Sequence, residues 1–299
     1  MPEFEYGFTV EKGGVKVEKR ICVAAVGDNC MDCYDDLGQS FPGGNPVNVA
    51  VYIRRLGGQA SYTGAVGSDP SGRQMIEAIA AKGVDTSHVQ VLEGKTAVSH
   101  VRLVEGDRVF GEYEEGVLAD FKLRPEDVSF LCAQDLVATG IWGMIEGDLP
   151  SISQKVPVAF DFANKFASPI VDRAIPYVTY AFFSYDEESR EDFAERCRQL
   201  GLGESSSDEE MLAGFMEAMW KLGPKAVIVT RGKAGSLAWD GSQLYRCGIV
   251  ECEVVDTMGA GDSFIAGFLY GVLEGKTIPE AMRAGAENSA VTLGYSGAW

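Results

Sequence analysis

The chain has 299 residues, of which 46% are hydrophobic, and its 44 acidic residues outnumber 26 basic ones to give a formal net charge of −18. A chain of this length and apolar content can bury a large core, which excludes disordered and fibrous classes. The negative charge repels phosphate backbones and anionic lipid, and no apolar run reaches the roughly 18 residues of a membrane span, so we expect neither a nucleic-acid nor a membrane partner.

Apolar, β-rich runs alternate with helical patterns from residue 21 onward. Residues 1–20 carry charges and three glycines without a clear period, and we expect them to form a flexible or appended leader. Continuous apolar strands separated by helices predict a mostly parallel sheet covered on both faces, forming one α/β domain over residues 21–299. The expected strands are 21–26, 60–66, 136–139, 156–161, 180–183 and 226–230, and the expected early helices are 47–56 and 71–82.

One segment departs from this α/β pattern. Residues 96–118 alternate apolar and polar side chains around Glu105-Gly106-Asp107, which predicts a β-hairpin with one face toward water. Residues 33–42 can add a further strand to it. We therefore expect a small β-sheet lid formed by about 33–42 and 96–118, which is also a candidate dimer surface.

The cysteines favour a reducing compartment. The chain has seven of them, an odd and scattered set with no apolar signal segment before it, so we expect free thiols and a cytoplasmic location. Cys30 and Cys33 form a CxxC, for which the alternatives are a redox pair or half of a zinc site. Neither histidine, His88 or His100, is near a cysteine in the sequence, so a zinc site would have to be assembled from distant segments.

The late segment Asp-Thr-Met-Gly-Ala-Gly-Asp (residues 256–262) is the most informative motif. It reads as a strand end and a Gly-rich turn that opens a helix, so backbone N–H groups gather at the positive helix end and can hold an anion. Asp262 in the first helical turn is suited to act as a general base toward a hydroxyl. The alternative is an ordinary glycine turn in which Asp262 is only a favourable helix N-terminal charge.

A second Gly-rich segment, residues 41–50, also opens a helix. Its adjacent glycines, Gly43 and Gly44, allow a ligand to approach the backbone, while Asn45 and Asn48 offer amides suited to hydroxyl groups. Upstream, Asp28 and Asp32 follow the first strand, at the edge where open α/β sheets bind ligands. The alternative for both segments is turn chemistry, with each side chain bonded to its own backbone.

Together these segments resemble the two signatures of the ribokinase-like (PfkB) carbohydrate kinase family, in the expected order, and the resemblance covers residues 21–299. It implies a three-layer α/β/α fold with a mostly parallel central sheet and a small β-sheet lid. Several segments are similar to those of family members that phosphorylate Amadori sugars such as fructoselysine; these are 27–30, 43–45, 107–111, 115–117, 141–143 and 297–299.

The resemblance also implies roles for individual residues. Asp262 would be the catalytic base. The other implied roles are an anion hole at Gly259, Ala260 and Gly261; sugar binding by Asp32, Gly43, Gly44, Asn45 and Asn48; ATP binding by Thr230, Gly232, Gly235 and Asn288; Mg²⁺ placement by Glu187; and binding of a monovalent cation such as K⁺ by Asp256. One departure is that Ser184 stands where the family usually has Asn, in the Asn-x-x-Glu motif that helps to place the magnesium-bound phosphates.

The implied activity is transfer of the γ-phosphate of ATP to a sugar hydroxyl, with the 6-hydroxyl of fructoselysine as the expected acceptor. Acidic lid residues, Glu112, Glu114 and Glu115, are candidates to attract the ammonium group, the alternative being plain solvent-facing positions. Trp142 either stacks on the aliphatic chain of the ligand or fills the core.

Other activities stay open at this point. The first alternative is another kinase of the family, acting on fructose, tagatose, ribose or 2-keto-3-deoxygluconate. The second is an NAD-dependent dehydrogenase, which is disfavoured because no Gly-x-Gly-x-x-Gly follows the first strand. We also expect a homodimer that pairs through the β lid.

Overall fold

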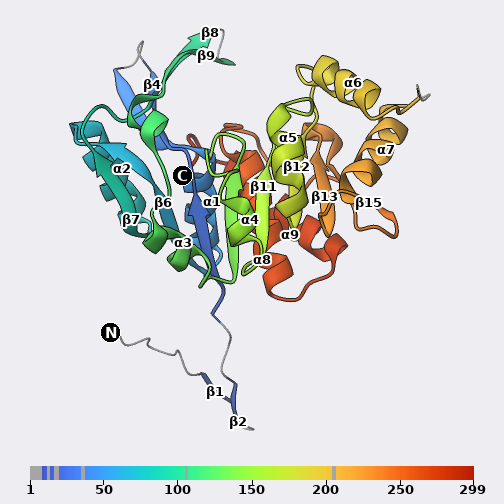
Figure 1. Cartoon of the computed structure of the whole chain (residues 1–299), viewed down its shortest axis with the longest axis horizontal. Coiled ribbons are helices and arrows are strands. Elements are labelled where there is room, and N and C mark those ends of the chain that lie inside the picture. Colours follow the sequence, from blue (N-terminus) through green and yellow to red (C-terminus); the bar gives the residue numbers. More distant parts are fainter. Residues whose placement is uncertain (1–8, 12–13, 17–19, 35–37, 105–106, 204–206) are drawn as a thin grey trace.

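A large twisted sheet organises the molecule (Figure 1). The computed structural model describes residues 9–11, 14–16, 20–34, 38–104, 107–203 and 207–299. In this part of the chain the sheet has nine strands; in spatial order they are β15 (Leu244–Cys247), β14 (Ser236–Trp239), β13 (Ala226–Thr230), β12 (Tyr180–Ser184), β11 (Val158–Asp161), β10 (Leu136–Gly140), β3 (Cys22–Val26), β6 (Gln59–Gly67) and β7 (Asp85–Leu92). The strands from β13 to β7 are parallel to one another. β14 pairs antiparallel with β13, and β15 pairs antiparallel with β14.

Helices cover both faces of this sheet, which gives the three layers expected from the sequence. One face carries α1 (Asn45–Arg55), α2 (Pro70–Ala81), α8 (Ala260–Leu273) and α9 (Ile278–Leu293). The other carries α3 (Pro125–Leu131), α4 (Leu149–Ile152), α5 (Pro169–Ala174), α6 (Arg190–Gln199) and α7 (Asp208–Trp220). Within the described residues there are also three 3₁₀ turns: η1 (Gly116–Asp120), η2 (Ile175–Tyr177) and η3 (Gly232–Ala234). Among the helices of the described residues, none combines the length and apolar character needed to cross a membrane.

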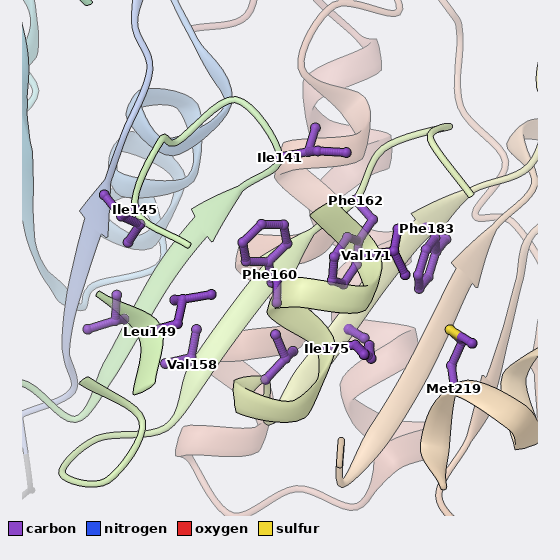
Figure 2. Close-up of a cluster of buried hydrophobic side chains, with 14 of the residues drawn as sticks. Ile141, Ile145, Leu149, Val158, Phe160, Phe162, Val171, Ile175, Phe183 and Met219 are labelled. Atoms are coloured by element: carbon purple, nitrogen blue, oxygen red, sulfur yellow. The ribbon is translucent and has the colours of Figure 1, made fainter. Parts of the chain in front are cut away.

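Two separate hydrophobic cores hold these layers together, one on each side of the sheet. Figure 2 shows the core beneath α4 and α5, where aromatic side chains from neighbouring strands meet. Phe162 and Phe183 stack with ring centroids 4.8 Å apart, and Phe160 lies 4.4 Å from Phe162. Because both sheet faces are buried, the central strands are continuously apolar, which is why they are readable in the sequence.

The expected central strands and early helices are all present, with ends displaced by up to two residues. Three strands, β7, β14 and β15, were not predicted from the sequence. In β7 and β15 every side chain is exposed or only partly buried, so the apolar pattern is interrupted in these two strands. An edge strand that faces water on one side loses the continuous apolar run that identified the others.

The small sheet also forms, from β4 (Cys30–Tyr34), β5 (Gln39–Gly43), β8 (Val98–Val104) and β9 (Asp107–Glu114), in the order β5-β4-β8-β9. The predicted hairpin is confirmed, with Val104 opposite Asp107, and its turn residues 105–106 lie outside the described residues. The β4–β8 pair is parallel, so the sheet is mixed. It projects from the end of the large sheet at which the strands β3, β10 and β11 terminate (Figure 1).

Within the leader, two short strands form where none was expected. Thr9–Glu11 (β1) pairs antiparallel with Gly14–Lys16 (β2), in a two-stranded sheet separate from the other two. The other leader positions, apart from Arg20, lie outside the described residues.

The CxxC pair lies within β4. Side chains three positions apart on a strand point to opposite faces, so the Cys30 and Cys33 thiols do not face a common partner. All seven cysteines are free, and within the described ranges no three His, Cys, Asp or Glu side chains gather as a metal-binding group. The thiol of Cys30 instead lies 3.4 Å from a carboxylate oxygen of Asp32. The structure therefore supports the expectation of free thiols.

Candidate active site

The turn before α8 brings Asp262 to the edge of the sheet. Gly259 is the N-cap and adopts φ = 71°, a left-handed conformation that glycine accepts without strain. A Cβ at this position would collide with the hydroxyl of Tyr52 and would approach Ala298. Gly259 is therefore required both by its backbone conformation and by its neighbours.

Unpaired amides mark the N-terminus of α8. The N–H of Ala260 is directed to the carbonyl of Thr257 at 3.3 Å, whereas the N–H groups of Gly261 and Asp262 find no acceptor among the described residues. A Cβ placed on Gly261 would have nothing within 4 Å, so the side of the first turn at Gly261 is open. Free N–H groups at a positive helix end form an anion-binding site. Of the three residues predicted to form the hole, Gly261 offers a free amide and Ala260 does not.

Two asparagines of α1 hold the carboxylate of Asp262. The side-chain amide of Asn48 donates to Oδ2 of Asp262 at 2.6 Å, and that of Asn45 donates to Oδ1 at 2.7 Å. The same Asn45 nitrogen also donates to Oδ2 of Asp161, at 2.8 Å. Both asparagines were predicted to hold sugar hydroxyls, and in this structure their amides are turned to the predicted base.

Three carboxylates share this site. Burial raises the pKa of Asp262 to about 7; the charges of Asp161 and Asp28 also raise it, and the bonds from Asn48 and Asn45 oppose the rise. Burial also raises the pKa values of Asp28 and Asp161 to about 6. Asp262 is therefore poised to exchange a proton near neutral pH, as a general base requires.

The early Gly-rich segment connects the small sheet to α1. A Cβ on Gly43 would lie 2.7 Å from Oδ2 of the buried Asp32, and Gly44 adopts φ = 116° as the N-cap of α1. Gly43 therefore leaves room for the Asp32 carboxylate, and Gly44 supplies the backbone conformation from which α1 starts. Of these residues, Asn45 is in contact with Asp262, and the contacts of the whole set with sugar stay a prediction.

The residues predicted to bind the nucleotide fall into two groups. Thr230 ends β13, and Gly232 and Gly235 bound the following turn with φ of 53° and 77°; a Cβ on Gly232 would meet open space. Asn288 is instead buried between α8 and α9, donating to the carbonyl of Ser263 at 2.7 Å and accepting from Arg55 at 2.7 Å. Both its polar atoms are thus bonded to protein, and its contact with nucleotide stays a prediction.

The two predicted metal residues lie in separate loops. Glu187 follows β12, is 85% exposed and lies 3.6 Å from Arg190. Asp256 accepts from the backbone N–H of Met258 at 3.0 Å and from that of Gly297 at 2.7 Å, which joins two loops. Mg²⁺ is commonly bound through one or two carboxylates together with substrate phosphates, so a single carboxylate is compatible with such a role.

Two residues of the site, Asp161 and Trp299, were not predicted from the sequence. Asp161 was recognised only as the end of a strand, although a carboxylate at the carboxyl end of a buried parallel strand is itself a signal. Trp299 was noted only as part of a similar segment, and its indole N–H donates to Oδ1 of Asn48 at 2.7 Å. No local pattern predicts a contact between residues 251 positions apart.

A half-buried carboxylate beside unpaired helix amides, at the carboxyl edge of a doubly covered α/β sheet, is suited to enzymes that activate a hydroxyl for group transfer. Comparison with known proteins identifies the family. The chain matches the pfkB family carbohydrate kinases over residues 32–299 and belongs to this family. It is therefore a phosphotransferase, and the dehydrogenase alternative is set aside.

The relatives agree with this assignment. The chain is 42% identical over 278 residues to a fructoselysine 6-kinase of Shigella flexneri, covering 93% of this chain and 99% of the relative. It is 36% identical over 279 residues to the fructosamine kinase FrlD of Bacillus subtilis, covering 92% of each. Among solved structures, Arabidopsis thaliana ribokinase complexed with ribose and ATP matches with a TM-score of 0.78 at 21% identity over 94% of each chain.

Proposed function

We propose that this carbohydrate kinase transfers the γ-phosphate of ATP to the 6-hydroxyl of fructoselysine. The observation that carries the chemistry is the Asp262 carboxylate, held by two amides beside the open N-terminus of α8. The substrate assignment rests on the two relatives named for fructoselysine and fructosamine. Both align over more than nine tenths of this chain.

In the proposed reaction, Asp262 accepts the proton of the sugar hydroxyl while the hydroxyl oxygen attacks the γ-phosphorus. A new O–P bond forms, the bond from the γ-phosphorus to the β,γ-bridging oxygen breaks, and ADP leaves with that electron pair. The free N–H groups of Gly261 and Asp262 would stabilise the negative charge of the transferred group. Positioning and charge stabilisation are the main demands of this chemistry.

Two observations support ATP as the phosphoryl donor. A Cβ on Gly261 or on Gly232 would meet open space, and the N–H groups of Gly261 and Asp262 have no acceptor among the described residues. When bound, Mg²⁺ neutralises charge on the phosphates, and Glu187 is the residue that we assign to its placement. Asp256 is assigned to a monovalent cation, because its carboxylate already organises the loop that precedes α8.

The small sheet, which we call the lid, offers an apolar surface for the lysine part of the proposed substrate. Partners across a sheet share a face, and the row Phe41–Asp32–Ser99–Tyr113 therefore lies on one side of the lid. Burial, followed by the charges of Cys30 and Asp28, raises the pKa of Tyr113, which sets this ring near the site. Phe41 and Tyr113 remain about half exposed. We assign this aromatic face to the aliphatic stem of the lysine part.

Two further expectations about substrate recognition can be refined. Trp142 is 49% exposed, which contradicts the alternative that it fills the core and leaves stacking on the ligand as its proposed role. Glu114 follows Tyr113 in the strand, so it points to the opposite face, where it lies near Lys95 and His100. We therefore retain Glu115, whose charge acts on Tyr113, as the candidate for the ammonium group.

We also propose that the protein acts in the cytoplasm as a homodimer formed through the lid. The lid sheet has two edge strands, β5 and β9, whose outer backbone groups are available for pairing with a second copy. Size-exclusion chromatography with light scattering tests this proposal. A dimer of about twice the chain mass supports it, and a monomer at micromolar concentration refutes it.

ADP release with a panel of acceptors tests the proposed activity. Fructoselysine should give a clearly higher kcat/KM than fructose, tagatose, ribose or 2-keto-3-deoxygluconate. Equal or greater activity with one of the others would refute the substrate while leaving the kinase chemistry in place. In the same assay, Asp262→Asn should lose about 10²-fold to 10⁴-fold in turnover with the fold intact, because it removes the general base. Near-normal turnover would refute the proposed base.

A further inference from the structure

The side chain of Trp299 lies behind the proposed base, separated from it by Asn48. Its indole N–H donates to Oδ1 of Asn48 at 2.7 Å, and Nδ2 of the same amide donates to Oδ2 of Asp262 at 2.6 Å. Asn48 is buried, with 5% exposure, so water does not compete freely for either bond. The three side chains form a chain of hydrogen bonds from the indole to the carboxylate.

The chemistry of the indole determines which way the amide points. A tryptophan side chain only donates, so the group facing it must be the amide oxygen. The amide nitrogen is then directed at Asp262. If the amide were reversed, its nitrogen would face the indole N–H and its oxygen would face the Asp262 carboxylate. Both hydrogen bonds would then be lost, and the partly negative amide oxygen would lie against the negative carboxylate.

Neighbouring contacts hold Trp299 in place. The backbone N–H of Gly297 donates to Asp256, and the carbonyl of Ala298 accepts from the hydroxyls of Tyr52 and Tyr295. The ring of Trp299 packs against the core on the α1 and α8 side, and Lys82 lies over it with Nζ 5.4 Å from the ring centroid. The indole is therefore fixed from several directions before it meets Asn48.

We propose that Trp299 is a positioning residue for catalysis, which keeps Asn48 in the orientation that donates to the Asp262 carboxylate. This inference rests on the proposed role of Asp262 as the base. It adds a residue that touches no reacting atom and acts through Asn48 alone.

The charge on Asp262 also responds to other groups, which any test must hold constant. Asp28, in the loop after β3, and Asp161, at the end of β11, act on it electrostatically, and the charge of Asp262 in turn acts on the hydroxyl of Tyr52 from α1. Asn45 supplies the second amide bond. A change confined to Trp299 leaves all of these in place.

The decisive variant is Trp299→Phe, which keeps an aromatic ring and removes the N–H donor. We expect kcat/KM at pH 7 to fall roughly tenfold, as for loss of a hydrogen bond that supports a charged group. We also expect the acid limb of the pH profile to move to higher pH, because the ionised form of Asp262 loses support. Trp220→Phe, the same substitution at a ring in α7 that packs against the other core, serves as the control and should leave that limb in place.

A double-mutant cycle tests the route through Asn48. In an Asn48→Ala background, Trp299→Phe should cost no further activity, since the amide that it orients is gone. Additive losses, or a Trp299→Phe variant with an unchanged acid limb, would overturn the proposal by showing that the ring acts only through packing.

A measurement on the unmodified protein covers the case in which Trp299→Phe does not fold. The four tryptophans give four indole N–H signals in a ¹⁵N NMR spectrum. The chemical shift of one of these signals should change with pH as Asp262 titrates, and this change should be absent in Asp262→Asn. Four signals whose chemical shifts do not depend on pH would refute the hydrogen-bond chain. This readout does not depend on turnover. Failure of the proposed base, seen as an active Asp262→Asn, is therefore distinguishable from failure of the positioning role.

Discussion

Asp161 and Asp262 are joined through a single nitrogen atom, the side-chain amide nitrogen of Asn45, which donates to both carboxylates at 2.8 and 2.7 Å. Asp161 ends a central strand, and Asp262 begins a helix of a covering layer. The carboxylate of Asp161 therefore places a second negative charge beside Asp262, the proposed base. That charge, added to burial, holds the pKa of Asp262 at about 7.

The pH dependence of the wild-type enzyme follows from this value. Below about pH 7 the carboxyl of Asp262 binds a proton and cannot accept another, so kcat/KM should fall about tenfold per pH unit on the acid side. Above that pH the base is ionised and the profile should level. Steady-state rates between pH 5 and 9 measure this, with circular dichroism to establish that the fold persists at pH 5. A flat profile down to pH 5 would contradict the assignment.

Replacing the neighbouring carboxylate should shift the profile in a known direction. In Asp161→Asn the repulsive charge is gone, so the pKa of Asp262 falls and the acid limb moves to lower pH. Asp120→Asn changes the net charge equally at an exposed position and should leave the limb unchanged. An unmoved limb in Asp161→Asn would show that the two carboxylates do not interact as the geometry indicates.

The two glycines at the start of α8 should respond differently to the same substitution. Gly261→Ala adds a methyl group to open space in a helix, so stability should hold or rise by about 0.5 to 1 kcal/mol, while kcat/KM should fall because the methyl is added next to the proposed anion site. Gly259→Ala should lose about 1 to 2 kcal/mol from the left-handed backbone alone, with more from the collision with Tyr52.

Urea unfolding, read beside kcat/KM, measures both glycine variants. The informative result is a Gly261→Ala protein that is stable and poorly active. If that variant keeps full activity, the space in front of Gly261 is not where the phosphoryl group is held.

The aromatic face of the lid should determine specificity. Tyr113→Ala removes an exposed ring from the side that carries Asp32, so the ratio of kcat/KM for fructoselysine over fructose should fall about tenfold, as for loss of apolar contact with the lysine stem. Glu114→Gln, on the opposite face, is the matched control and should leave the ratio unchanged. An unaltered ratio in Tyr113→Ala would place the lysine part elsewhere.

Much of this fold can be predicted without coordinates. The central strands are buried on both faces, so their continuous apolar runs identify them, and the alternating run around residues 105–107 identifies the lid hairpin. The glycines before Asp262 and Asn45 can also be predicted to form turns, because a positive φ or a close approach of the backbone favours glycine at that position. The edge strands escaped prediction, since partial exposure interrupts their apolar pattern.

The amino-acid sequence by itself determined the α/β class, the two Gly-rich helix starts and the place of Asp262 at one of them, because each depends on neighbours within a few residues. Only the tertiary structure decided that Asp161 lies beside Asp262, that Asn45 and Asn48 turn their amides to it, and that Trp299 donates to Asn48. Those contacts join residues more than a hundred positions apart. They arise from the order of strands in the sheet and the seating of helices on it, which are set by packing of the whole core and by no local pattern.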